Sequence, residues 1–154
     1  MGKYNITERT VKKAAYRSMI NPKLMKELQS KIINVIADQK KYRDKNYSAK
    51  KLAEDLGTNT RYISAAVNVT FNMNYSSFVN RYRIAEAMKL LGEARNKSLN
   101  MEDISDMVGF SNRQSFYAAF YRINHCTPRE YKLSQLQKTQ LGNNNVQMNA
   151  GSPA

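Results

Sequence analysis

The sequence predicts an all-α protein of about seven helices preceded by a basic N-terminal arm. Only three prolines and six glycines interrupt its 154 residues. Apolar residues recur at helical spacing, and no run of five or more residues alternates in the way of a β-strand. One segment of the chain also repeats itself. We therefore expect two similar helical units joined by one long helix.

The expected elements begin after an arm at residues 1–23, of which 11–20 has the composition of a short helix. Asn21 and Pro22 combine an N-cap with a first-turn proline. The helix that follows has apolar residues at Leu28, Ile32 and Ile36 and is predicted to end near Tyr42. It would turn its apolar stripe toward a core in a helical domain at residues 24–133.

The repeat aligns residues 52–67 with residues 104–120, so that Gly57 and Gly109 lie 52 residues apart, with one extra residue in the second turn. Ser48 is a fair N-cap for the first copy, and a capping box of Ser111 and Gln114 is expected to open the last helix of the second. A small residue lies four positions before each glycine, which lets two helices approach as in a helix-turn-helix. The two motifs are predicted at about 48–68 and 100–122. Their inward apolar positions are Leu52, Leu56, Ile63, Val67, Ile104, Val108, Phe116 and Phe120.

A linker helix at residues 75–91 is predicted between the two motifs, and a last helix at 128–138 begins with Thr127, Pro128 and Glu130 in capping-box order. Residues 139–154 lack apolar periodicity and are predicted to be a disordered tail. Helical spacing among other apolar residues assigns a further set to the core and not to a cofactor site: Tyr82, Met88, Phe110, Phe116 and Phe120.

Composition narrows the class of partner. The 25 Lys and Arg against 12 Asp and Glu give a net charge of +13, concentrated before residue 52, which favours a polyanion and above all nucleic acid. The alternative for any one basic cluster is a solvated surface. Cys126 and His125 are the only cysteine and histidine, so we expect no disulfide, structural metal or cofactor. The sequence shows no nucleophile paired with a base, no catalytic carboxylate pair and no phosphate-binding loop. We therefore do not expect an enzyme.

The location of the protein is predicted from what the chain lacks. No apolar stretch approaches the roughly 20 residues that cross a bilayer, and the N-terminus has no secretory signal. We therefore expect a soluble cytoplasmic protein.

Two helix-turn-helix units in one chain fit the geometry of double-stranded DNA. Major grooves on one side of B-form DNA recur about every 34 Å. A 17-residue linker helix spans roughly 25 Å, and the widths of the units add to that length. A helical bundle with coincidental turns is the alternative, because many helix pairs in enzymes share this pattern.

The stretch IxxxVGFSNRQSFYAAFYRINHCTPREY, at residues 104–131, resembles the signature of AraC/XylS-type transcriptional regulators. The stretch YSSFVNRYRIAEAMKLL, at residues 75–91, resembles the linker helix of that family. The resemblance covers about residues 25–133 and implies a bacterial regulator that places two recognition helices in adjacent major grooves of a promoter. Only the arm precedes the first helix, so we expect a stand-alone member or a fragment of a longer regulator.

The sequence departs from the family pattern in ways that bear on specificity. Ala65 and Ala118, which are predicted to face outward on the two recognition helices, stand where many members have a long polar or basic side chain. An alanine can still touch a thymine methyl, which would favour A·T pairs. Asn68 and Val69 replace a frequent basic pair, and His125 replaces a glycine before the last helix.

Outward positions of the two recognition helices are the candidates for contact with base edges. Arg suits the O6/N7 edge of guanine, and Gln or Asn suits the N6/N7 edge of adenine. The alternative for each is a phosphate contact or a solvated side chain. The base-reading candidates are Arg61, Ser64, Asn112, Arg113, Gln114 and Tyr117. The phosphate-binding candidates, near helix starts and on the linker, are Ser48, Lys50, Lys51, Thr60, Arg81, Ser111, Thr127 and Arg129.

Two functions remain open at this point. The first is sequence-specific regulation of transcription by a monomer, with RNA polymerase as a further candidate partner and no small-molecule ligand. The second is an architectural or recombination accessory protein that uses the same units to bend or bridge DNA. In both, Lys12, Lys13 and Arg17 of the arm would follow the DNA backbone or enter a minor groove, and the alternative is that the arm is only a nonspecific electrostatic tether.

Overall fold

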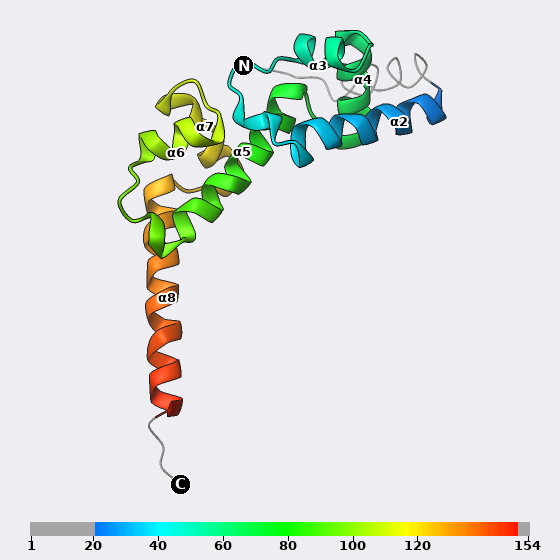
Figure 1. The fold of residues 1–154 in the computed structure, drawn as a ribbon. Coiled ribbons are helices and arrows are strands. Elements are labelled where there is room, and N and C mark those ends of the chain that lie inside the picture. Colours follow the sequence, from blue (N-terminus) through cyan, green and yellow to red (C-terminus); the bar gives the residue numbers. More distant parts are fainter. Residues whose placement is uncertain (1–20, 151–154) are drawn as a thin grey trace, which may run out of the picture. The chain divides into compact units, whose positions relative to one another are not determined.

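The computed structural model describes residues 21–150, which form seven α-helices and three short turns of other helix types, with no strand among them (Figure 1). This confirms the predicted all-α class. The arm at residues 1–20 lies outside the described residues. The elements in order are α2 (Pro22–Ile33), η1 (Asn34–Asp38), η2 (Lys41–Arg43), α3 (Ala49–Asp55), α4 (Thr60–Phe71), α5 (Tyr75–Gly92), η3 (Ala94–Asn96), α6 (Met101–Val108), α7 (Arg113–Asn124) and α8 (Pro128–Ala150).

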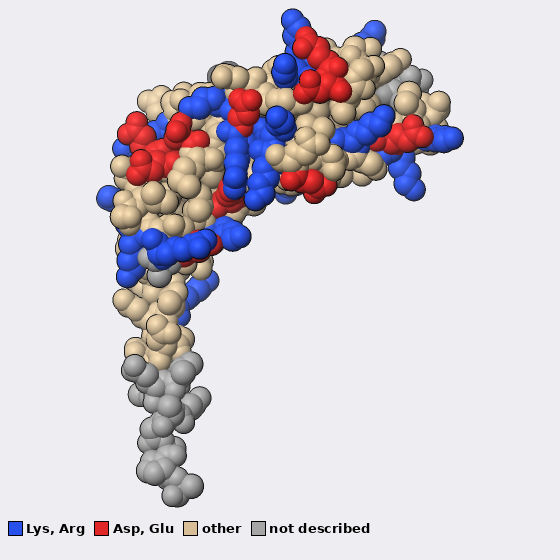
Figure 2. All heavy atoms as spheres, viewed as in Figure 1, with Lys and Arg blue, Asp and Glu red and all other residues tan. Residues whose placement is uncertain are grey.

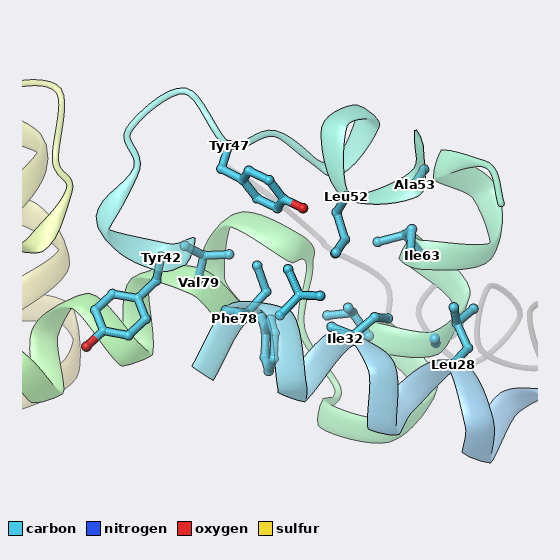
Figure 3. Close-up of a cluster of buried hydrophobic side chains, with 13 residues drawn as sticks. Leu28, Ile32, Tyr42, Tyr47, Leu52, Ala53, Ile63, Phe78 and Val79 are labelled. Atoms are coloured by element: carbon cyan, nitrogen blue, oxygen red, sulfur yellow. The ribbon is translucent and has the colours of Figure 1, made fainter. Parts of the chain in front are cut away.

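The chain divides into two compact units, one ending at Tyr82 and the other beginning at Arg83. In the first unit, α2 and α3 both pack against α4. Ile32, Leu52 and Ile63 are completely buried where these helices meet (Figure 3). Phe78 and Val79 at the start of α5 complete this core. The predicted apolar stripe of the first helix therefore faces a core, as expected.

The first helix ends earlier than its composition predicted. The α-helical hydrogen bonding of α2 stops at Ile33, Asn21 caps its start, and a single π-helical turn, η1, follows. Lys40 then adopts a left-handed conformation with φ of 56°, which a helix cannot continue through. Tyr42, predicted as the helix end, lies in the separate turn η2, where it is buried and stacks on Tyr82 at 6.0 Å between ring centroids.

A second tyrosine holds the loop that leads into α3. The Tyr47 ring is buried, and its hydroxyl donates a hydrogen bond of 2.5 Å to the Asp55 carboxylate. The Tyr75 hydroxyl donates to the Tyr47 carbonyl at 2.9 Å. Burial first, and then the bond to Asp55, raise the pKa of Tyr47 well above its usual value of 10.0.

We expect this tyrosine to make the protein sensitive to alkali. The pKa is raised in the folded state, so the stabilisation is complete below about pH 10 and declines as the pH rises beyond it. Tyr47→Phe should cost about 1 kcal/mol at pH 7. It should also flatten the fall in urea midpoint between pH 9 and pH 11. An equally steep fall in the variant would contradict the assignment to Tyr47.

The second unit is organised around aromatic rings. Phe116 and Phe120 of α7 are completely buried, and Phe116 contacts Phe110 and Phe120 at 5.5 and 5.9 Å between ring centroids. Phe120 also meets Tyr131 of α8 at 5.6 Å. Ile84, Ala87 and Leu91, from the later turns of α5, belong to the same cluster. The predicted core assignment is confirmed for the three phenylalanines, while Tyr82 and Met88 are half-buried against their clusters.

Both α4 and α7 end on a left-handed residue that is not glycine. Asn72 has φ of 57° and His125 has φ of 58°. Each backbone N–H donates to the carbonyl four residues earlier, at 2.9 Å from Asn72 and 2.8 Å from His125. A Cβ in this conformation costs roughly 1–2 kcal/mol, less for asparagine than for most residues.

We expect His125→Gly to stabilise the protein by about 0.5 to 1 kcal/mol, because the relief of left-handed strain exceeds the added flexibility of glycine in the unfolded chain. That gain corresponds to a few degrees in thermal midpoint for a domain of this size. Asn72→Gly is the matched control and should give less. Thermal unfolding measures both, and a destabilised His125→Gly variant would be contrary to this account.

The last helix starts as predicted and continues further. Thr127 and Glu130 form the expected reciprocal cap, with bonds of 3.1 Å in both directions. However, α8 runs to Ala150, so the prediction of an end at 138 and of disorder from 139 is wrong up to that residue. Missing apolar periodicity indicates that a segment has no packed face, and a helix can still form without one. Leu141 is 64% exposed, and a Cβ added at Gly142 would meet no atom within 4 Å.

No helix in the described range 21–150 is both long enough and apolar enough to cross a bilayer.

Candidate nucleic-acid interface

The two repeated segments form two helix-turn-helix motifs with the same turn. In α3–α4, Gly57 is left-handed, and the Thr58 N–H donates to the Ala53 carbonyl at 2.9 Å. In α6–α7, Gly109 is left-handed, and the Phe110 N–H donates to the Ser105 carbonyl at 3.0 Å. Each turn therefore closes on the small residue four positions before its glycine.

Those small residues also lie where the helices meet. Ala53 and Ser105 are 3% and 2% exposed, so a larger side chain would force the paired helices apart. The Ser105 hydroxyl donates to the Asn112 carbonyl at 3.4 Å, which ties α6 to the start of α7. The predicted reason for a small residue at this place, close helix approach, agrees with the burial.

The outer face of α7 carries three of the six predicted base-reading residues. Arg113 and Gln114 are exposed on its first turn, and Tyr117 is half-buried one turn later. The Arg113 guanidinium lies 5.0 Å from the centroid of the Tyr117 ring and donates to its hydroxyl at 3.3 Å. This contact orders the guanidinium and uses one of its N–H donors, so that other N–H groups can still donate to a base.

Asn112 has a capping role in addition to the predicted one. It is the N-cap of α7, and its side-chain oxygen accepts a hydrogen bond from the Ser115 N–H at 2.8 Å. The amide oxygen has a second lone pair and the amide nitrogen is a donor, so the expected contact of Asn112 with adenine stays a prediction. The predicted capping box of Ser111 and Gln114 is wrong, because α7 begins two residues after Ser111, which leaves Ser111 exposed in the turn.

Sequence reasoning missed Tyr121 on the same face of α7. It is 57% exposed, and it follows Tyr117 by four residues and Gln114 by seven, which places all three on one side of the helix. That spacing was available in the sequence as a signal. Ala118, predicted to face outward, is exposed beside them.

The corresponding face of α4 offers shorter side chains. Thr60 and Arg61 are exposed on its first turn, while Ser64 and Asn68 are half-buried. Ala65 was predicted to face outward, and this is wrong, because its exposed fraction is 0%. A methyl group covered in this way cannot touch a thymine, so of the predicted base readers in the first unit only Arg61 combines length with exposure.

The predicted phosphate-binding residues lie at the starts of helices or on exposed faces. Ser48 caps α3 by accepting from the Lys51 N–H at 3.1 Å, and Lys50 and Lys51 are exposed. Arg81 is exposed on α5 and Arg129 on the first turn of α8. Thr60 and Ser111 are exposed, as noted above, and Thr127 is half-buried as the cap of α8. Figure 2 shows Lys and Arg side chains spread over the face in view, with Asp and Glu groups between them.

Metal ligands do not gather anywhere in residues 21–150. No group of three or more His, Cys, Asp or Glu side chains there is arranged to hold an ion.

Comparison with known proteins bears on the fold and the family. A family model described as a helix-turn-helix domain matches residues 52–134, more than half of the chain. Among solved structures, the C-terminal domain of the two-component response regulator yesN from Fusobacterium nucleatum is 25% identical, with a TM-score of 0.57 over 70% of this chain and 96% of that one. An AraC-type transcriptional regulator from Chromobacterium violaceum is 22% identical, with a TM-score of 0.52 over 58% and 78%. The chain belongs to the AraC-type helix-turn-helix family.

Another solved structure agrees in fold. The C-terminal domain of AraT, a response regulator from Geobacillus stearothermophilus, is 19% identical, with a TM-score of 0.58 over 71% of this chain and 84% of that one. No curated protein matched the chain. The AraC-type assignment identifies α4 and α7 as the second helices of the two motifs and makes this a domain of the DNA-binding, transcription-regulating class.

Proposed function

We propose that this protein binds double-stranded DNA in a sequence-specific manner, with α4 and α7 in adjacent major grooves, and thereby regulates transcription. The observation that carries the proposal is the outer face of α7, where Arg113 and Gln114 are exposed at the start of a recognition helix. These two side chains have the donor and acceptor geometry for guanine and adenine. In the first unit, Arg61 is the corresponding reader.

The length of α5 supports the placement in adjacent grooves. Its 18 residues extend roughly 27 Å, and successive major grooves on one side of the duplex are about 34 Å apart. Phosphate contacts from Lys50, Lys51, Arg81 and Arg129 would fix the register on the backbone. One chain then covers both halves of a site, so we propose that a monomer suffices.

The setting that we propose is the cytoplasm of a bacterium, where RNA polymerase is the partner through which a promoter-bound regulator acts. We propose neither a ligand nor a catalytic step. Regulation then depends on how much of the DNA site is occupied, which is set by the concentration of the protein.

Genomic occupancy tests the proposal. Chromatin precipitation and sequencing of the tagged protein should give discrete promoter peaks that share a two-part motif. Arg113→Ala with Gln114→Ala should remove those peaks, while Arg122→Ala should keep them. Arg122 is exposed in the last turn of the same helix, roughly 14 Å along its axis from Arg113 on the first turn.

A different pattern would favour the second candidate, an architectural or recombination accessory protein. Broad occupancy that is indifferent to the Arg113 and Gln114 substitutions would mean that charge governs binding. The sequence-specific proposal would then be abandoned.

A further inference from the structure

A strongly basic segment precedes and opens α3 in the first unit. Residues 40–51, which we call the basic segment, contain six Lys or Arg and one acidic residue. All six cationic side chains are exposed. Four of the six, Lys40, Lys41, Arg43 and Lys45, lie before the helix cap Ser48 and so outside the helix-turn-helix itself.

The basic segment is fixed to the core of its unit. Tyr42 and Tyr47 are 7% and 6% exposed, and they anchor it at two points, through the stacking on Tyr82 and the hydrogen bond to Asp55 described above. The Lys41 ammonium lies 5.7 Å from the centroid of the Tyr47 ring. A charged surface that is already ordered loses little conformational entropy on binding.

The equivalent segment of the second unit has the opposite character. Asn100 caps α6 as Ser48 caps α3, and the same offset of 52 residues pairs the basic segment with residues 92–103. These contain two basic and three acidic residues. Arg95 is bound to Glu93 at 2.7 Å, and the helix start is acidic where α3 has Lys50 and Lys51.

That acidic start disfavours a phosphate at the second unit. Glu102, Asp103 and Asp106 line a hollow beside the α6–α7 turn. The Asp103 carboxylate accepts from the Asn100 N–H at 3.0 Å and so occupies a position where a phosphate would otherwise bind. Two units with the same backbone pattern thus present different charges to a DNA strand.

We infer that the basic segment is a phosphate-binding surface for the backbone of duplex DNA and that the two units contribute unequally to binding. The first unit supplies sequence-independent, salt-dependent affinity. The second unit, whose recognition helix has the more open face, supplies base discrimination. This inference rests on the proposed function and adds to it a division of roles and a contact surface that lies outside the helix-turn-helix.

Salt dependence measures such contacts. Each phosphate neutralised changes the slope of log K against log[salt] by about 0.9 on B-form DNA. Removing two contacts should make the slope less steep by about 1.8. Between 50 and 200 mM salt, the wild type should then lose about 12-fold more affinity than the variant.

The test compares two charge-matched double variants of the full chain on a preferred duplex and a scrambled one. Lys40→Asn with Lys45→Gln removes two cations from the basic segment, and asparagine tolerates the left-handed conformation at position 40. Arg95→Gln with Lys97→Gln removes two from the equivalent segment. We expect the first variant to make the slope of log K against log[salt] less steep on both duplexes and to keep the ratio of their affinities. We expect the second variant to leave that slope unchanged.

The outcomes separate this inference from the proposed function. Equal wild-type affinity for the two duplexes would overturn the proposed function. The inference alone would be overturned if the wild type prefers one duplex but the first variant keeps the wild-type salt slope. The same holds if both variants change that slope equally. If thermal unfolding shows that the first variant is destabilised, Lys50→Gln with Lys51→Gln, on the exposed start of α3, must reproduce its slope.

Discussion

Alanine at both Arg113 and Gln114 is expected to lower affinity for a preferred DNA site by about 30-fold or more while affinity for scrambled DNA changes little. A bidentate contact to the correct base contributes about 1–3 kcal/mol of discrimination, and both side chains are exposed on the first turn of α7. The loss of two such contacts corresponds to about 2 to 6 kcal/mol. Fluorescence anisotropy on a duplex selected from a random pool measures it.

Arg122→Ala controls for loss of charge on the same helix. It removes one cation from the last turn of α7, away from the first-turn residues Arg113 and Gln114, and should keep at least half of the preference for the selected site. A preference that survives in the Arg113 and Gln114 variant would mean that bases are read elsewhere. Arg61→Ala would then be the next variant, because Arg61 is the long exposed side chain at the start of α4.

Truncation of Phe116 to alanine is expected to remove about 3–5 kcal/mol of stability, because it would leave a large cavity in the core of the second unit. The ring is completely buried and contacts Phe110, Tyr117 and Phe120. A loss of this size approaches the whole stability of many small domains. Urea unfolding of Phe116→Ala, followed by circular dichroism, measures the difference.

Tyr121→Ala is the matched aromatic control on the same helix. That ring is 57% exposed, so its removal should change stability by less than about 0.5 kcal/mol. Should Phe116→Ala cost less than about 1 kcal/mol, the packing described for the second unit would be wrong. Hydrogen exchange would show in addition whether the loss is confined to residues after Arg83.

The fold was predictable because its signals are local and repeated. Gly57 and Gly109 mark the two turns, and both are left-handed in the structure. Ser48 and Thr127 cap the helices that they were predicted to cap. In each case the conformation depends on hydrogen bonds within a few residues, so the sequence carries the information directly.

The parts that were missed depend on contacts between distant residues or on a choice between neighbours. Which of two adjacent residues, Ser111 or Asn112, caps α7 is decided by where the first helical turn closes. The anchoring of the basic segment needs the hydroxyl of Tyr75, 28 residues away from the Tyr47 carbonyl that accepts from it. The burial of Ala65 likewise reflects tertiary surroundings that a helical pattern does not contain.

The separate cores of the two units affect how the protein would leave DNA. One hydrophobic cluster ends at Val79 along the chain and the other begins at Ile84. Each unit can therefore keep its fold while the other dissociates from DNA. A unit that has released its groove would remain tethered at millimolar effective concentration and rebind before the whole chain escapes. Residence on a site would therefore be long in dilute solution and would shorten when competing DNA captures the released unit.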